Sequence, residues 1–566
     1  MKYLLKVALV IFISLFVFQN KCEAKRVKPN SVYVLKLDGP LLEYKGESSF
    51  SDKIMESIGL KANNSIGLNQ ILKNIRAAKY NPRIEGIYLK GGKLLAGWAS
   101  IQEIRDALID FKSTGKFIYA YADEYSQSNY YLVSVADRIM LNPYGTIDLK
   151  GLSSSTTFYK NGLDKLGVKF EVVKVGSYKS APEPFTEDSM STENREQLTE
   201  MLNSMWKTID SGIAVSRKIS SNEVDSIADL YAALLPSQDL KSAHLIDTLV
   251  YADEIDSIVN KLSTEKPKFR LIGHESFTRI NRNIDRNKNK IAVIYANGDI
   301  GGSRNGIDAQ NIARICRGLA RNSSVKAVVL RVNSPGGSAF DSEKIWRSLS
   351  KLKEKKPLVV SMGNYAASGG YYISCMADKI IAEPTTITGS IGIFGMFPDL
   401  SKLNQKIGLT TQTIKTNKMG DAYSVNRPFA EAERKLMQEN VDRGYDLFVK
   451  RCADGRKKTV DEINAIAGGH VWSGEKAKEI GLVDEIGGLF DAVKIAGRLA
   501  GCYTYQLMVP QTEKRGGSIY LTALKQKLSE EIIQQNLGSY YDIFQKMNDV
   551  QNLDKIQAKS FIIVDE

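Results

Sequence analysis

The sequence predicts an α/β fold made of two tandem repeats followed by a C-terminal extension. Short runs rich in β-branched residues alternate with amphipathic stretches of helical period, which is typical of α/β units with mostly parallel strands. The second half of the chain also repeats the pattern of the first. Expected strands are GIYLK, KFIYAYA and FEVVKV in the first half and AVVLRV, PLVVSM and TTQTIK in the second, with helices at ASIQEIRDALIDFK and DSEKIWRSLSKLK.

The duplication is visible in the residues themselves. YYLVSVADRIMLNP at 130–143 matches YYISCMADKIIAEP at 371–384 with six identities and a shift of 241 residues. GIYLK at 86–90 matches AVVLR at 327–331 with the same shift. Internal repeats of this kind indicate that one structural unit was duplicated.

The repeats divide the chain into five expected segments. We expect a signal peptide or short membrane anchor at 1–24 and an N-terminal α/β repeat at 30–255. A linker is expected at 256–290, because its end, NRNIDRNKNK, is polar and basic. A C-terminal α/β repeat is expected at 291–500 and a helical extension at 501–566, which contains SIYLTALKQKLSEEIIQQ.

The N-terminus predicts export. Two lysines precede an unbroken apolar run from Val7 to Phe18, and Cys22-Glu23-Ala24 offers small residues for cleavage. Twelve helical residues reach about 18 Å, whereas a bilayer core is about 30 Å thick. A cleaved signal peptide therefore fits slightly better than a permanent anchor, although Tyr3 to Phe18 could span a membrane with Lys6 reaching the interface.

The composition argues against a nucleic-acid-binding protein and against a metal- or disulfide-stabilised one. The net charge of +13 is spread through the chain, and neither zinc-ligand spacing nor an RNA-binding aromatic signature accompanies it. An anionic membrane surface is thus a better expected partner than a nucleic acid. Five cysteines lie far apart without a CxxC motif, so buried thiols are expected instead of a metal site or a disulfide framework: Cys22, Cys316, Cys375, Cys452 and Cys502.

Ser368 is a candidate nucleophile. It lies in SMGNYAASGGYYIS at 361–374, where a strand is expected to end at Gly363 and GGYYISCMA is expected to form a helix. A strand-to-helix turn exposes backbone N–H groups to a ligand. A serine needs a base, but none of the three histidines (His244, His274 and His470) lies in a segment that we interpret as a site, so the base must be of another type.

Two glycine loops predict an oxyanion hole. Gly369 follows Ser368, and RVNSPGGSAF at 331–340 brings Gly336 and Gly337 to the same edge of the sheet. Two backbone N–H donors from two such loops can stabilise the anion that forms in acyl transfer. The alternative interpretation is that these small residues only let a helix pack on the sheet.

The candidate base is Lys179, in VGSYKSAPEPF at 175–185. Its counterpart in the second repeat is Gly420, while EYSQSNYY, the first-repeat counterpart of the serine loop, lacks the glycine pair. One repeat has kept a lysine and the other a serine, which predicts a single site assembled from both. A solvated loop lysine is the alternative interpretation.

These motifs resemble the signal peptide peptidase A (protease IV) family in its long, tandem-repeat form. VGSYKSAPEPF, RVNSPGGS, YAASGGYYIS and TGSIGIFG carry the resemblance, which covers about residues 30–500. It implies a Ser-Lys peptidase with a Clp-protease/crotonase-like fold. It also implies the nucleophile Ser368, the general base Lys179, the lysine-orienting hydroxyl Ser390, and an oxyanion hole at Gly369 and the Gly336–Gly337 loop.

The resemblance further implies a homotetramer that degrades cleaved signal peptides and other hydrophobic peptides without a cofactor or metal. It would lie in the bacterial cell envelope, at the periplasmic face of the inner membrane or exported to the periplasm. Two alternatives remain open at this point. A crotonase-type acyl-CoA enzyme would use the same fold without Lys179, and a non-catalytic envelope scaffold would not need Ser368.

Overall fold

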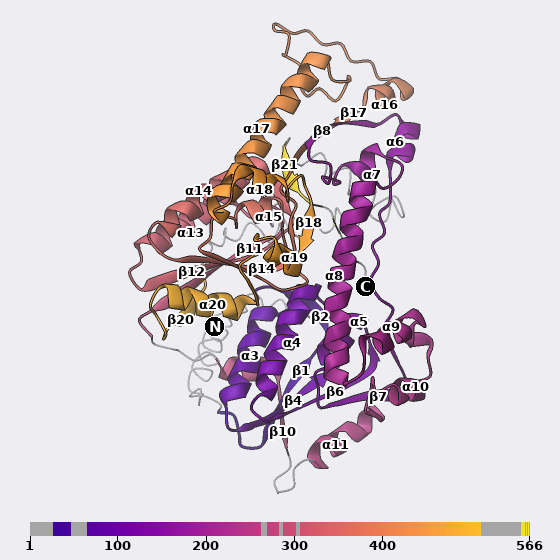
Figure 1. Ribbon diagram of the computed structural model, residues 1–566, viewed down its shortest axis with the longest axis vertical. Coiled ribbons are helices and arrows are strands. Elements are labelled where there is room, and N and C mark those ends of the chain that lie inside the picture. The colour runs from indigo at the N-terminus through magenta and orange to yellow at the C-terminus, as the bar shows by residue number, and fades with distance from the viewer. Residues whose placement is uncertain are drawn as a thin grey trace, which may run out of the picture.

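The computed structural model describes residues 26–46, 65–261, 269–281, 287–301, 306–510, 556–560, 562 and 564. It confirms an α/β fold with two repeats, each built on a mostly parallel sheet covered by helices (Figure 1). The expected N-terminal signal peptide or anchor lies outside the described residues. Among the helices that are described, none is long and apolar enough to cross a membrane.

The first repeat is built on a six-stranded sheet of order β10-β1-β4-β6-β7-β9, with every neighbouring pair parallel. Its strands are β1 (Ser31–Lys36), β4 (Ile84–Lys90), β6 (Phe117–Tyr125), β7 (Arg138–Ile147), β9 (Thr248–Leu249) and β10 (Arg270–Gly273). The helices are α3 (Leu68–Tyr80), α4 (Trp98–Lys112), α5 (Gln127–Val133), α6 (Lys160–Leu166), α7 (Glu183–Thr186), α8 (Thr192–Arg217), α9 (Ser221–Asp229) and α10 (Ser237–Ser242).

The second repeat has an eight-stranded sheet. Its strands are β11 (Lys290–Asn297), β12 (Val325–Ser334), β14 (Leu358–Ala367), β15 (Lys379–Ala382), β16 (Ile387–Gly389), β18 (Val471–Ser473), β19 (Glu485–Ile486) and β20 (Gln506–Met508). Its helices are α13 (Ala309–Arg321), α14 (Ala339–Lys353), α15 (Gly369–Tyr372), α16 (Ser401–Lys406), α17 (Glu431–Arg456), α18 (Val460–Asn464), α19 (Gly474–Glu479) and α20 (Leu489–Leu499).

The strand order itself records the duplication. The path β20-β11-β12-β14-β15-β19 in the second sheet follows the path β10-β1-β4-β6-β7-β9 in the first, pair by pair and all parallel. Each repeat therefore ends with a strand that returns beside its own first strand. The second repeat adds β16 and β18 beyond β14, and these two strands lie next to the serine turn.

Part of the expected linker belongs to the first repeat. Residues 256–290 contain most of α11 (Ile255–Lys261), all of β10 and α12 (His274–Ile280). β10 pairs with β1, and Phe277 of α12 is fully buried with its ring 5.0 Å from that of Tyr33. The sequence did not predict β10, because an edge strand of only four residues has a weak hydrophobic pattern.

The C-terminal extension also contributes strands. β20 extends the second sheet, and β21 (Gln557–Lys559) pairs with β13 (Gly336–Ser338). The expected helical stretch SIYLTALKQKLSEEIIQQ lies outside the described residues. The chain thus returns to the second repeat after residue 555.

A sheet of order β13-β21-β17-β8 connects the two repeats. β8 (Lys169–Val175) of the first repeat pairs antiparallel with β17 (Ile393–Asp399) of the second over their whole length. The expected strand TTQTIK at 410–415 is wrong: those residues are irregular and exposed, and β17 takes the place beside β8. This sheet brings the segment after β8 against the second repeat.

A second connection between the repeats is a buried ion cluster. The guanidinium of Arg331 on β12 donates from Nε to Glu43 Oε2 at 2.8 Å and also contacts the carboxylate of Glu103 on α4. All three side chains are buried. Because a buried charge without its partner is costly, this cluster fixes the first repeat against the strand that leads into the Gly336–Gly337 loop.

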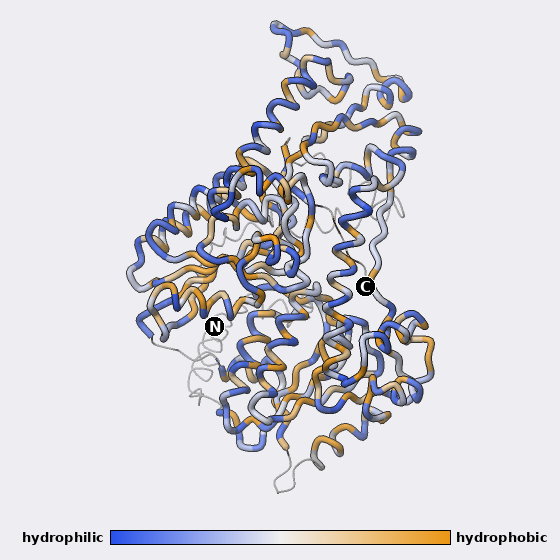
Figure 2. Tube along the Cα trace, in the orientation of Figure 1, coloured by the Kyte–Doolittle hydropathy of each residue, from blue (hydrophilic) through white to orange (hydrophobic). Residues whose placement is uncertain are grey.

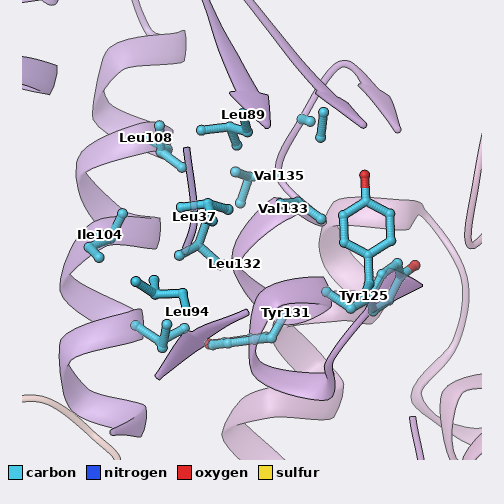
Figure 3. Close-up of a cluster of buried hydrophobic side chains, with 14 of the residues drawn as sticks. Leu37, Leu89, Leu94, Ile104, Leu108, Tyr125, Tyr131, Leu132, Val133 and Val135 are labelled. Atoms are coloured by element: carbon cyan, nitrogen blue, oxygen red, sulfur yellow. The ribbon is translucent and has the colours of Figure 1, made fainter. Parts of the chain in front are cut away.

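The cores follow the expected pattern of buried strands beneath amphipathic helices. In Figure 2 the strands are predominantly hydrophobic and the outer helix faces hydrophilic. Figure 3 shows Ile104 and Leu108 of α4 facing Leu89 of β4 and Leu132 of α5. The described cysteines are free and buried, as expected: Cys316, Cys375, Cys452 and Cys502. Cys22 lies outside the described residues.

The short elements complete the description. β2 (Gly39–Leu42), β3 (Ile66–Gly67) and β5 (Leu94–Leu95) form a small parallel sheet. Two 3₁₀ turns occur at Ala232–Leu234 and Ala252–Glu254. α17, α16 and the β8–β17 ribbon rise from the body of the protein into a projecting arm (Figure 1).

Candidate active site

Ser368 lies at the turn between β14 and α15. β14 continues to Ala367, four residues beyond the expected end at Gly363, and α15 is a single turn where a longer helix was expected. Ser368 has φ 54° and ψ −114°, a conformation that is uncommon for a residue with a side chain. Its N–H donates to Gly389 O at 2.8 Å. The tight turn holds the buried hydroxyl at the C-terminal edge of the sheet, where strained residues often serve a function.

Lys179 reaches Ser368 from the other repeat. Its Nζ lies 2.9 Å from Ser368 Oγ and 3.0 Å from Ser390 Oγ. It also donates to the backbone oxygen of Ser390 at 3.4 Å. Lys179 is 1% exposed and Ser390 is 2% exposed, so water does not compete for these contacts. The structure therefore brings all three expected side chains into one hydrogen-bonded group.

Burial determines the protonation state of the Lys179 amine. Desolvation lowers the pKa of Lys179 to about 7, from an ordinary value of 10.5. The contacts to its amine come from hydroxyl and carbonyl oxygens. A substantial fraction of the amine is consequently neutral at physiological pH and able to accept a proton.

Residues that the sequence did not single out hold the lysine loop. A Cβ atom at Gly469 would lie 2.6 Å from Lys179 N, and one at Gly392 would lie 3.2 Å from Lys179 Cδ. Gln197 on α8 donates to Tyr178 O at 3.1 Å and accepts from Val471 N at 3.1 Å. The adjacent glycines in GGH at 468–470 were a signal for close backbone approach, whereas nothing in the sequence marks Gln197.

His470 lies closer to the site than expected. Its backbone oxygen accepts from Ser390 N at 2.7 Å, and its ring stacks on Trp472 with centroids 3.6 Å apart. The ring of Tyr178 lies 4.3 Å away on the lysine loop. The Nδ1 atom of His470 lies 2.8 Å from Val471 O. His470 therefore has a structural role in the site, and Lys179 is the candidate base.

The expected oxyanion glycines lie against one another. A Cβ atom at Gly369 would lie 3.1 Å from Gly336 Cα. Gly336 has φ 111° and Gly337 has φ 149°, so both need glycine. The N–H of Gly336 donates to Ser334 Oγ at 3.2 Å, whereas the N–H of Gly369 begins a helix and has no intrahelical acceptor. The N–H of Gly369 is therefore better placed than that of Gly336 to bind an anion.

A pocket adjoins the lysine. It has a volume of about 350 Å³ and a mostly apolar surface, and its wall includes Lys179 and Ser390 among several polar side chains. The apolar lining comes from both repeats and from the C-terminal segment: Tyr159, Ala181, Pro184, Phe185, Leu198, Val471 and Ile562.

A buried serine hydroxyl in contact with a buried lysine amine, beside two glycine loops, is the arrangement expected of a hydrolase with a serine nucleophile. The model of peptidase family S49 matches residues 110–266 and 350–502, which confirms the duplication. The chain belongs to peptidase family S49 and is a serine-type peptidase.

The chain is similar to proteins from distant organisms. It is 36% identical to "Protease 4" of Haemophilus influenzae over 82% of this chain and 78% of that protein. It is 30% identical to the chloroplastic "Serine protease SPPA" of Arabidopsis thaliana over 84% of this chain and 70% of that protein. Among solved structures, a ClpP1 mutant of Listeria monocytogenes matches 36% of this chain and 94% of its own with 16% identity and a TM-score of 0.25.

Proposed function

We propose that this protein is a serine endopeptidase with a Ser-Lys dyad that hydrolyses hydrophobic peptides, including the remnants of cleaved signal peptides. The observation that carries the proposal is the 2.9 Å contact between the Lys179 amine and the Ser368 hydroxyl, made inside the protein and between the two repeats. The lowered pKa of Lys179 supports its role as the base.

The mechanism follows from this geometry. Neutral Lys179 takes the proton of Ser368 as the Oγ atom attacks a peptide carbonyl, and Ser390 keeps the amine directed at Ser368. The backbone N–H groups of Gly369 and the Gly336–Gly337 loop stabilise the oxyanion. The lysine then gives its proton to the leaving amine, the C–N bond breaks, and an acyl-enzyme remains. Water, deprotonated by Lys179, attacks the ester, and Ser368 recovers its proton.

The substrate class rests on the pocket. Its apolar lining supports burial of a hydrophobic peptide, because removing apolar side chains from water is the main source of affinity for such ligands. The name "Putative signal peptide peptidase SppA" of a relative in Enterococcus faecium, 38% identical over 34% of this chain, agrees with this substrate class.

We propose the location and the assembly of the protein from its charge and its apolar segments. The apolar N-terminal run and the net charge of +13 support an exported protein at an anionic membrane surface, in the periplasm or at the periplasmic face of the inner membrane. Exposed apolar side chains on the projecting arm support self-association, as in the expected homotetramer: Ile407, Leu409, Ile414 and Met419.

The pH dependence of peptide hydrolysis tests the proposal. With a quenched hydrophobic peptide, we expect kcat/KM to rise about tenfold per pH unit below pH 7 and to level off above it, because only the neutral amine accepts the proton. A purified protein that hydrolyses no peptide but binds acyl-CoA would contradict the proposal. So would a rate that does not change between about pH 5 and pH 9.

A further inference from the structure

A second cavity lies between the two repeats, apart from the candidate active site. Its volume is about 350 Å³, which is within the range of small-ligand sites. Its walls come from α3 and α4 of the first repeat and, in the second, from the loop after β15 and the first turn of α20. Figure 1 shows α20 beside α3 and α4. The cavity shares no lining residue with the pocket beside Lys179.

A buried carboxylate without a partner lines this cavity. Glu383, in the loop after β15, is 1% exposed, and its Oε2 atom has no hydrogen-bond partner among the described residues. Glu103 on α4 lines the same cavity, but it pairs with Arg331 and accepts from Leu489 N at 3.3 Å. Because a buried polar group without a partner is costly, Glu383 indicates that a positive group binds in the cavity.

The charges around Glu383 do not balance. The carboxylates of Glu43, Glu103 and Glu383 are all buried, and Arg331 pairs with the first two. Glu383 makes no ion pair with any residue that the structure describes. Burial raises the pKa of Glu383 well above its ordinary value, and the charge of Glu103 raises it further. A bound cation would take the place of the proton that Glu383 otherwise holds.

The groups that act on Glu383 come from every element around it, and negative charge dominates them. They are Glu103 and Asp106 on α4, Tyr131 on α5, Arg331 on β12 and Asp491 on α20. Asp106 is exposed, and its carboxylate accepts from Gln102 at 2.9 Å. The opening of the cavity therefore offers a second carboxylate to a ligand.

The lysines that line the cavity already have partners. Lys79 on α3 pairs with Asp110 at 2.6 Å, and Lys494 on α20 pairs with Asp491 at 3.0 Å. Neither lysine pairs with Glu383. The positive group that Glu383 lacks must therefore come from a ligand.

An organic ammonium ion fits this cavity better than a metal ion. In the part of the chain that the structure describes, no three His, Cys, Asp or Glu side chains are arranged to hold a metal. An ammonium group donates hydrogen bonds to single carboxylates and needs no such arrangement. Part of the wall is apolar and suits an alkyl chain: Leu72, Ile75, Ala107, Leu489 and Phe490.

We propose that the cavity between the repeats binds a small aliphatic ammonium ion of the diamine or polyamine class. One ammonium group pairs with Glu383, the alkyl chain packs on Leu489 and Phe490, and a second ammonium group pairs with Asp106. Because both repeats supply the wall, the bound ion stabilises their association, and the thermal midpoint rises with its concentration. The inference goes beyond the proposed function, and its test needs no peptidase activity.

Calorimetric titration of the full chain at constant ionic strength tests the inference. The probes are the diamine putrescine, the monoamine n-butylamine and the uncharged butanediol. We expect saturable binding of putrescine, weaker binding of n-butylamine and no binding of butanediol. The affinity for putrescine should rise between about pH 6 and about pH 8, because the ligand binds the ionised form of Glu383, whose pKa is raised.

Three variants locate the binding. Glu383→Gln keeps the shape of the side chain but removes its charge, and it should weaken the binding of both amines at least about tenfold. Asp106→Asn changes an exposed carboxylate, so it should fold normally; it should weaken putrescine about threefold and leave n-butylamine unchanged. Glu479→Gln is the matched control, because Glu479 has a 59% exposed side chain outside the cavity, and it should bind both amines as wild type does.

Three results would overturn the inference. They are the absence of saturable binding of putrescine up to about 10 mM, equal affinity in wild type and Glu383→Gln, and displacement of putrescine by an equal concentration of Mg²⁺. The Asp106→Asn comparison of the two amines decides the question even where Glu383→Gln does not fold.

Discussion

Replacing Ser368 with alanine is expected to lower kcat for peptide hydrolysis by about 10⁴-fold with no loss of folding. The hydroxyl is the atom that forms the acyl-enzyme, and removing a catalytic serine typically leaves only the contribution of the oxyanion hole and binding. Ser368 is fully buried, and alanine fits in its place without overpacking. The measurement is kcat with a quenched peptide, together with the thermal midpoint.

Ser128→Ala is the matched control. Ser128 is also a fully buried serine near the turn that follows a parallel strand, but in the first repeat, where the glycine pair is missing. We expect it to retain kcat. Equal losses in Ser128→Ala and Ser368→Ala would place the cause in folding, and full activity of Ser368→Ala would contradict the assignment of the nucleophile.

Lys179→Met is expected to abolish hydrolysis and, at the same time, to stabilise the fold. Loss of the base should lower kcat by about 10³-fold or more. Holding the amine neutral at pH 7 costs roughly 4 kcal/mol, at 1.36 kcal/mol per pKa unit. Methionine removes this cost but leaves two serine hydroxyls without their hydrogen bonds, at about 1 kcal/mol each, so the net gain is roughly 2 kcal/mol.

The gain in folding stability from Lys179→Met should decrease as the pH rises. The pKa of Lys179 is about 7 in the folded state and near 10.5 when unfolded, so between these values the unfolded chain binds more protons. Wild-type stability therefore rises from about pH 7 to about pH 10.5, and the advantage of Lys179→Met shrinks over that range. Denaturant unfolding at several pH values measures the stability difference between wild type and Lys179→Met. Lys165 is exposed, so Lys165→Met is the control. Retained activity, or an equal gain from both variants, would contradict the account.

The sequence was sufficient to predict the two-repeat fold, because duplication preserved the buried strands that define each sheet. It was also sufficient to predict that Ser368 and Lys179 lie together, whereas Ser390 was implied by the family resemblance alone. Two features of the sequence indicated the site: a glycine-flanked serine, and a lysine without a counterpart in the other repeat.

What the sequence did not predict depends on contacts between distant segments. β17 replaced the expected strand at 410–415 because its partner β8 lies in the other repeat, and strand propensity alone does not specify pairing. Gln197 supports the lysine loop from a helix whose pattern is otherwise ordinary. β21 has only three residues, and its position is set by the unusual backbone of the Gly336–Gly337 loop.

The central claim is that a neutral amine from the first repeat activates a hydroxyl from the second. The rate at which a small fluorophosphonate labels Ser368, followed by mass spectrometry in wild type and Lys179→Met across pH, tests it most directly. We predict labelling at Ser368 that rises with a midpoint near pH 7 and is lost in Lys179→Met. Labelling of Ser368 at the same rate with and without Lys179 would contradict the claim.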